Sequence, residues 1–283
     1  MALFSLIMVL LAERMRLVAD TFQFEAWFKW YRGLMFDDQA LRSPGKMLVA
    51  LALPALLVAI VQSWLVGVWF GVLHLALWIL VGLLLFGHAP LRQRFRQYLD
   101  AARRGDTQSC FNHADSLDES SAIQAASLEE MGKRMGQLSA WLNYRFYAAV
   151  ALYYVLLGPA MATLYCTVRA YHDHFAAQDL RRPLVGPVMK LLDWVPVRIV
   201  SLGFALSGHF SKAAPVLVPK VLDPMADPRT MITEVALAAE EVPETSGEPL
   251  CVQPTLALLK LAKRNFILLL VLVSLLTIFG VIH

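Results

Sequence analysis

The strongest constraint in this sequence is a set of long apolar windows that carry almost no charge. A helix needs about 20 residues to cross the hydrocarbon core of a bilayer, which is ~30 Å thick. In lipid, every backbone N–H and C=O must find a partner within the protein, and a helix provides those partners. The sequence therefore predicts an all-α fold, a polytopic helical bundle in a membrane with five or six membrane segments. The predicted segments are Ala2–Ala12, Leu48–Trp64, Gly67–Gly87, Arg145–Val168, Leu184–Leu206 and Phe266–Ile282.

The composition agrees with this interpretation and excludes several classes of protein. Hydrophobic residues make up 58% of the 283 residues and charged residues only 17%, whereas soluble domains carry about a quarter charged residues. A disordered chain and an ordinary soluble enzyme are therefore excluded. A net charge of +3 is too small to indicate a nucleic-acid-binding protein. The three cysteines are far apart and form no CxxC pair, so they predict neither a metal site nor a disulfide framework.

The N-terminal region holds a short apolar segment and an aromatic stretch. As a helix, Ala2–Ala12 covers only about 16 Å. It therefore either continues past Glu13 and Arg14 toward Val18 or crosses the membrane in part. The stretch Phe22–Arg32, dense in aromatic residues, predicts an amphipathic helix. This helix either lies at the level of the lipid headgroups or packs against the bundle.

Two long stretches are polar. Residues 88–142 are predicted to be a cytoplasmic helical insertion, in which the Ser/Asn/Asp-rich stretch Thr107–Ser121 is a loop. Within residues 211–263, the stretch Asp223–Pro254 is rich in Pro, Glu, Asp and Thr and is predicted to be a flexible loop. These features divide the chain into the segments 1–46, 47–87, 88–142, 143–210, 211–263 and 264–283.

The basic residues predict the orientation of the chain in the membrane. Three regions, Arg14–Lys46, His88–Arg145 and Lys212–Arg264, hold six, eight and six Lys or Arg residues. The turn Gln62–Val66 holds none, and the link Ala170–Leu184 holds two. Because Lys and Arg accumulate in cytoplasmic loops, the three basic regions are predicted to be cytoplasmic, with both termini on the opposite side of the membrane.

The segment from Lys190 to Arg198 places ionisable residues inside an apolar helix. Lys190, Trp194 and Arg198 are spaced i, i+4, i+8 and share one stripe, with Asp193 beside them. Pro196 removes an amide donor and leaves the carbonyl of residue 192 without its helical partner. Ionisable groups at membrane depth cost several kcal/mol unless they are paired or hydrated.

This segment has two interpretations. In the first, it forms a pocket for an anionic or amphiphilic ligand. In the second, Asp193 forms an internal ion pair with Lys190 or Arg198, and this pair fastens the helices.

A second cluster, with Asn143, Arg145 and Tyr147, begins the fourth membrane segment. It is either part of the site or an interfacial belt with one snorkelling arginine. A third cluster at the other end of that segment comprises Tyr165, Arg169, His172 and Asp173. The two clusters lie at opposite ends of one helix, which Gly158-Pro159 is expected to bend.

No cofactor is predicted. The stretch from Ala40 to Lys46 resembles a loose phosphate-binding loop, but Met47 provides no hydroxyl for Mg²⁺. Pro44 also removes an amide from the loop. A lysine directly before an apolar span is better explained as an interfacial anchor.

Three runs of this sequence resemble the AmpE family of inner-membrane proteins. They are Trp141-Leu-Asn-Tyr-Arg-Phe-Tyr147, Leu191-Leu-Asp-Trp-Val-Pro-Val-Arg198, and Ala205-Leu-Ser-Gly-His209 with Lys212. The opening residues with Glu13 and Arg14 and the closing apolar span fit the same resemblance. It implies a regulatory or sensory role in β-lactamase induction and cell-wall recycling. Other membrane proteins and an anionic cell-wall or lipid-like ligand are possible partners, and Glu13, Arg14 and His209 join the candidate binding residues.

AmpE in turn resembles the CobD/CbiB family of membrane amide synthases through the segment Asp193-Trp-Val-Pro-Val-Arg198. The acidic residues that would hold Mg²⁺ and phosphate in that family are replaced here by neutral residues and a cation. A non-enzymatic sensor is therefore favoured over the alternative, a membrane enzyme descended from those ATP-dependent synthases. No catalytic or metal-binding residue is predicted.

Overall fold

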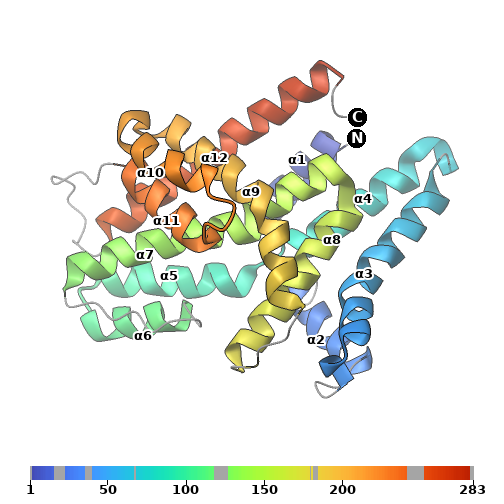
Figure 1. Ribbon diagram of the computed structural model, residues 1–283, viewed down its shortest axis with the longest axis horizontal. Coiled ribbons are helices and arrows are strands. Elements are labelled where there is room, and N and C mark those ends of the chain that lie inside the picture. The colour runs from blue at the N-terminus through green and yellow to red at the C-terminus, as the bar shows by residue number, and fades with distance from the viewer. Residues whose placement is uncertain are drawn as a thin grey trace. The chain divides into compact units, whose positions relative to one another are not determined.

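The computed structural model describes residues 2–15, 23–35, 40–66, 68–117, 127–178, 180, 184–240 and 252–280. Helices, joined by short turns, account for these residues, and no strand occurs among them (Figure 1). The fold is an all-α polytopic bundle, as predicted. The chain divides into two compact units. Unit 1 comprises Met1–Ala89, Ala149–Leu192 and Val273–His283, and unit 2 comprises Pro90–Ala148 and Asp193–Leu272.

Four helical runs in the described part of the chain are long and apolar enough to cross a membrane. They are Pro44–Leu65, Val72–Arg103, Leu128–Ala177 and Gln253–Ile278, and Ala2–Glu13 is a shorter apolar helix. The predicted segment Leu184–Leu206 does form a helix, α9 (Val185–Ser207), but α9 is not among the four. Its three ionisable residues explain the difference: Lys190, Asp193 and Arg198.

Unit 1 is built on the hairpin of α3 (Pro44–Leu65) and α4 (Val72–Phe86), which packs on α8 (Ala149–Ala177). The short helix α1 (Ala2–Arg14) packs on α4 and α8. Gly82 of α4 permits this close approach, because a Cβ there would lie 2.6 Å from Val9 of α1. At the tip of the hairpin, Trp64 and Trp69 are exposed, as is typical of residues at a membrane–water interface.

The aromatic stretch forms α2 (Phe24–Met35), and its contacts favour the packed alternative. The Tyr31 hydroxyl donates to the Ala50 carbonyl of α3 at 2.9 Å. The ring of Phe28 meets that of Tyr171 of α8 edge-on, with 4.9 Å between centroids. Trp30 and Leu34 point outward from the same helix and are exposed. The part of this stretch before Gln23, and the continuation of α1 toward Val18, lie outside the described residues.

The predicted bend at Gly158-Pro159 is confirmed. Gly158 has φ 86° and ψ 176° inside α8, a conformation that is not helical. Pro159 has no N–H to donate to the preceding turn, and glycine tolerates the positive φ that the kink requires.

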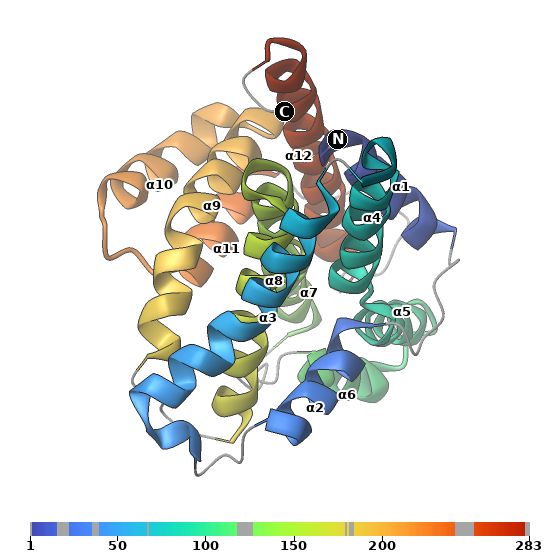
Figure 2. The ribbon, with the colours of Figure 1, turned by 90° about the vertical axis from the view of Figure 1, so that its right-hand side faces the viewer.

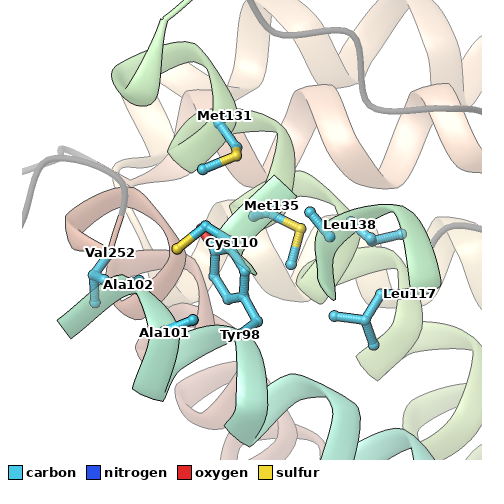
Figure 3. Packing of buried hydrophobic residues seen from close by; sticks show 10 residues of the cluster. Tyr98, Ala101, Ala102, Cys110, Leu117, Met131, Met135, Leu138 and Val252 are labelled. Atoms are coloured by element: carbon cyan, nitrogen blue, oxygen red, sulfur yellow. The ribbon is translucent and has the colours of Figure 1, made fainter. Parts of the chain in front are cut away.

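Unit 2 has a core built from three amphipathic helices, α5 (Ala89–Arg103), α6 (Thr107–Leu117) and α7 (Leu128–Asn143). The first residue of α5, Ala89, still belongs to unit 1. Each of them places small or apolar side chains in one buried cluster, together with Val252 (Figure 3). The cluster comprises Tyr98, Ala101, Ala102, Cys110, Ala114, Leu117, Met131, Met135, Leu138 and Val252.

Two stretches that were expected to be loops are helical. The prediction of a loop over Thr107–Ser121 was wrong for Thr107–Leu117, which form α6. Asp106 precedes this helix, and its carboxylate accepts from the Ser109 amide at 3.0 Å. The prediction of a flexible loop over Asp223–Pro254 was wrong for Pro228–Ala239, which form α11 with Asp227 as the N-cap. In both helices, apolar residues at helical spacing among the polar ones are buried in unit 2, which outweighs the polar composition. Residues 118–121 and 241–251 lie outside the described part.

The second half of unit 2 consists of α9 from Asp193 onward, α10 (Phe210–Leu222), α11 and α12 (Gln253–Ile278) up to Leu272. Helix α10 follows α9 after a short turn and lies alongside it (Figure 2). At this turn the His209 amide donates to the Ala239 carbonyl at the end of α11, at 2.7 Å. Helix α11 also packs against α7.

Candidate functional site

Pro196 lies inside α9 and releases the carbonyl of Leu192 from helical bonding. The sequence predicted that this carbonyl, on Leu192, stays unpaired. It is instead paired within unit 1, because the Tyr153 hydroxyl of α8 donates to it at 2.6 Å. The helix therefore tolerates its proline at little hydrogen-bonding cost, since the freed acceptor finds a side-chain donor.

Asp193 is the buried carboxylate of the segment, with 3% of its surface exposed. The Tyr144 hydroxyl donates to its Oδ1 atom at 2.5 Å, and Tyr144 itself is fully buried. This contact lies within unit 2. The predicted ion pair with Lys190 or Arg198 is not what the structure shows: Lys190 is exposed, and the Arg198 guanidinium binds backbone carbonyls.

Tyr144 belongs to a π-helical turn, η3 (Tyr144–Ala148), which follows α7. Such turns carry an extra residue relative to an α-helix and are frequent at functional sites. The sequence reasoning missed Tyr144, because it assumed regular spacing and so paired Asn143 with Tyr147. Asn143, Tyr144 and Tyr147 all lie in the run Trp141–Tyr147, but the π-helical turn that makes Tyr144 the contacting residue leaves no mark in the sequence. Asn143, Arg145 and Tyr147 are half-buried in this turn.

Arg145 contacts an aromatic ring of the preceding helix, α7. Its guanidinium carbon lies 5.7 Å from the centroid of the Trp141 ring, one turn earlier. The Trp141 ring in turn stacks on Tyr144, with centroids 5.4 Å apart. The aromatic pair thus connects the arginine of this turn to the tyrosine that binds Asp193.

Arg198 lies on the same stripe as Trp194, as predicted, and its guanidinium carbon is 4.2 Å from the centroid of the indole ring. Its Nη1 donates to the Trp194 carbonyl at 2.8 Å. The other two contacts fasten α9 to the C-terminal end of α10: Nε donates to the Val221 carbonyl at 3.2 Å and Nη2 to the Asp223 carbonyl at 2.7 Å. A cation is favourable there because a helix ends in unpaired carbonyls.

The remaining predicted residues lie elsewhere. Glu13 is half-buried near the end of α1 in unit 1, and the side chain of Arg14 lies outside the described part. His209 is exposed at the start of α10, where its backbone forms the turn with α11. The structure therefore joins Tyr144 to Asp193 and Trp194 to Arg198, all in unit 2.

The third cluster is placed at the C-terminal part of α8 in unit 1. Tyr165 is buried and stacks on Tyr153, with centroids 5.2 Å apart. Arg169 is 2% exposed, whereas His172 and Asp173 are partly exposed and lie 3.5 Å apart. No group of three His, Cys, Asp or Glu side chains able to hold a metal occurs among the described residues.

The fold and these contacts define a polytopic, all-α membrane protein in which one otherwise apolar helix, α9, carries three ionisable residues. The family model for the regulatory signalling modulator protein AmpE matches residues 1–283. Protein AmpE of Shigella flexneri is 29% identical over 295 aligned residues, which cover 99% of each chain. No solved structure matches this chain. The chain belongs to the AmpE family and is a regulatory membrane protein.

Proposed function

We propose that this protein is an inner-membrane sensor that modulates β-lactamase induction and cell-wall recycling by binding an anionic amphiphile at Arg198 and Trp194. The main loops face the cytoplasm in this proposal, and both termini face the periplasm. Family membership supports the regulatory role. The arrangement around Arg198 supports the ligand class.

The observation that carries the proposal is that the Arg198 guanidinium binds neutral carbonyls and forms no ion pair among the described residues. The guanidinium is partly exposed, and it donates to the neutral backbone carbonyls of Trp194, Val221 and Asp223. Among the described residues, no carboxylate forms an ion pair with it. Carbonyls orient a guanidinium without neutralising it, so an anion that binds there gains a charge-assisted hydrogen bond. Trp194, half-exposed beneath the guanidinium, offers an apolar and π surface to the rest of the ligand.

The test is β-lactamase induction in a strain whose chromosomal copy is deleted and replaced by variants, with activity divided by the amount of membrane-inserted protein. We expect Arg198→Ala to lose the wild-type effect on induction per molecule. Arg134→Ala is the matched control, because Arg134 lies in the same unit but is paired with Glu130 at 2.8 Å on the surface of α7. It is expected to behave as wild type.

Asp193→Asn separates signalling from stability. Asp193 is buried and accepts from Tyr144, so its loss is expected to lower the amount of protein while activity per molecule is kept. Arg198→Ala with a normal effect per molecule would overturn the proposal.

A further inference from the structure

The Arg198 guanidinium retains hydrogen-bonding capacity after its three backbone contacts are counted. Arginine has five N–H donors, one on Nε and two on each terminal nitrogen. Nε, Nη1 and Nη2 each donate to one carbonyl. One N–H therefore remains on Nη1 and one on Nη2. Two donors on the terminal nitrogens of a planar fork match a group with two anionic oxygens, such as a phosphate or a carboxylate.

Large apolar side chains near these donors are exposed, and the Asp223 carboxylate on the same turn accepts from the Met225 amide at 2.8 Å. On α9, Val195 is 50% exposed and Leu202, one turn beyond Arg198, is 47% exposed. On the turn whose carbonyls bind the guanidinium, Leu222 is 77% exposed and Met225 is 90% exposed. A cation ringed by exposed large apolar side chains and an indole is typical of the boundary between headgroups and acyl chains, where Arg and Trp both anchor.

We propose that Arg198 and Trp194 form a binding site for an anionic lipid of the surrounding bilayer. The two anionic oxygens of the headgroup accept from Nη1 and Nη2, and an acyl chain lies along Leu202 and Leu222. The inference rests on the proposed function, and it identifies the amphiphile as a membrane lipid and not a soluble cell-wall fragment. Phosphate and carboxylate headgroups share the required chemistry, so the test compares both.

Binding is measured with lipids that carry bromine on the acyl chain, because bromine quenches tryptophan on contact. The full-length chain in an uncharged detergent is titrated with brominated phosphatidylglycerol, phosphatidylcholine and oleic acid. The signal of Trp194 is the difference between the wild type and Trp194→Phe. We expect phosphatidylglycerol to bind about tenfold more tightly than phosphatidylcholine, the size of one charge-assisted interaction. Comparison with oleic acid shows whether phosphate or carboxylate is the better headgroup.

Two variants connect this preference to the site. Arg198→Gln removes the charge and is expected to bind both phospholipids equally, whereas Arg134→Gln keeps the preference. Because Arg198→Gln also removes contacts to α10, Leu202→Asp provides a second variant that leaves Arg198 and its carbonyls in place. It puts a negative charge one turn from the guanidinium on an exposed position, so it is expected to abolish the preference without changing the thermal midpoint.

The outcomes distinguish this inference from the proposed function. Equal quenching of Trp194 by phosphatidylglycerol and phosphatidylcholine in the wild type overturns the lipid site, even if Arg198→Ala still impairs induction. Competition of the lipid by millimolar inorganic phosphate, with no dependence on the acyl chain, also overturns it. A clear lipid preference together with normal induction by Arg198→Ala supports the lipid site and removes the proposed function.

Discussion

The hydroxyl of Tyr144 lies 2.5 Å from the carboxylate oxygen Oδ1 of Asp193, and both side chains are buried within unit 2. Tyr144 begins the π-helical turn η3, and Asp193 begins the part of α9 that belongs to the same unit. The contact therefore fixes the register between the end of α7 and α9. Trp194 directly follows Asp193 on α9, and Arg198 lies one turn further along the helix.

This contact predicts strong coupling between the two residues. Tyr144→Phe and Asp193→Ala are each expected to lower the free energy of unfolding by about 1–3 kcal/mol, because each leaves or removes a buried polar partner. The double variant is expected to lose less than the sum of the two, since one change already removes the shared bond. Equilibrium unfolding in mixed micelles measures the free energy of unfolding of the wild type, the two single variants and the double variant. Strict additivity would show that the pair does not stabilise the fold.

A second prediction concerns Gly203 of α9, which packs against Asn265 of α12. The Asn265 amide nitrogen donates to the Val200 carbonyl at 3.1 Å. A Cβ at Gly203 would lie 2.1 Å from the side-chain oxygen Oδ1 of Asn265, which is an overlap. Gly203→Ala is therefore expected to lower the free energy of unfolding by an overpacking cost of about 1–3 kcal/mol.

Gly186→Ala is the matched control on the same helix, because nothing lies within 4 Å of a Cβ there. It is expected to change the free energy of unfolding much less than Gly203→Ala, because its Cβ meets no side chain from another element. Pairing Gly203→Ala with Asn265→Ala is expected to restore part of the loss. The prediction fails if the two glycine substitutions have the same effect.

The helical class and the main apolar segments followed directly from the sequence, because charge-free windows of membrane length have few alternatives. The bend at Gly158-Pro159 followed from the chemistry of the two residues. The helices α6 and α11 did not. Their sequences are polar overall, and what makes them helical is burial of spaced residues such as Ala114 and Val235, which depends on neighbours distant in sequence.

The candidate site was predicted in part. The stacking of Arg198 on Trp194 follows from i, i+4 spacing on one helix, so it was accessible from sequence. The contact of Asp193 with Tyr144 was not, because local spacing favours Lys190 and Arg198, whereas Tyr144 is 49 residues away in sequence. Long-range pairing through an irregular π turn leaves no periodic signal.

A third prediction addresses the kink in α8. Gly158 has φ 86° and ψ 176°, a region of backbone conformation that is essentially restricted to glycine. Gly158→Ala is expected to lower the free energy of unfolding by about 1–3 kcal/mol. The nearest side-chain atom, on Trp78, is 3.7 Å from a Cβ at this position, so the cost comes from the backbone and not from a clash. Trp78→Phe added to Gly158→Ala is therefore expected to give no rescue. Rescue would show a steric origin.

A fourth prediction concerns pH and the cap of α6. The side-chain and backbone hydrogen bonds from Ser109 hold the pKa of Asp106 below its usual value of 3.8. A carboxylate with a lowered pKa stabilises the folded state above its unfolded pKa, and this stabilisation is lost as pH falls through the folded value. The thermal midpoint of the wild type is therefore expected to exceed that of Asp106→Asn near neutral pH. The gap should narrow below about pH 4. A gap that is constant with pH would show that the charge has no role.

The last prediction concerns the orientation of the chain. The three basic regions hold six, eight and six Lys or Arg residues, and positive loops remain in the cytoplasm. A reporter inserted within residues 241–251 is therefore expected to be active on the cytoplasmic side, and one fused after His283 on the periplasmic side. Alkaline phosphatase, active only outside, and a fluorescent protein, active only inside, give opposite signals at each position. The fusion after residue 283 shows whether α12 crosses the membrane or not. Helix α12 is long and apolar enough to cross the membrane, so a cytoplasmic signal there together with a cytoplasmic signal at 241–251 would contradict both the orientation and the crossing of α12.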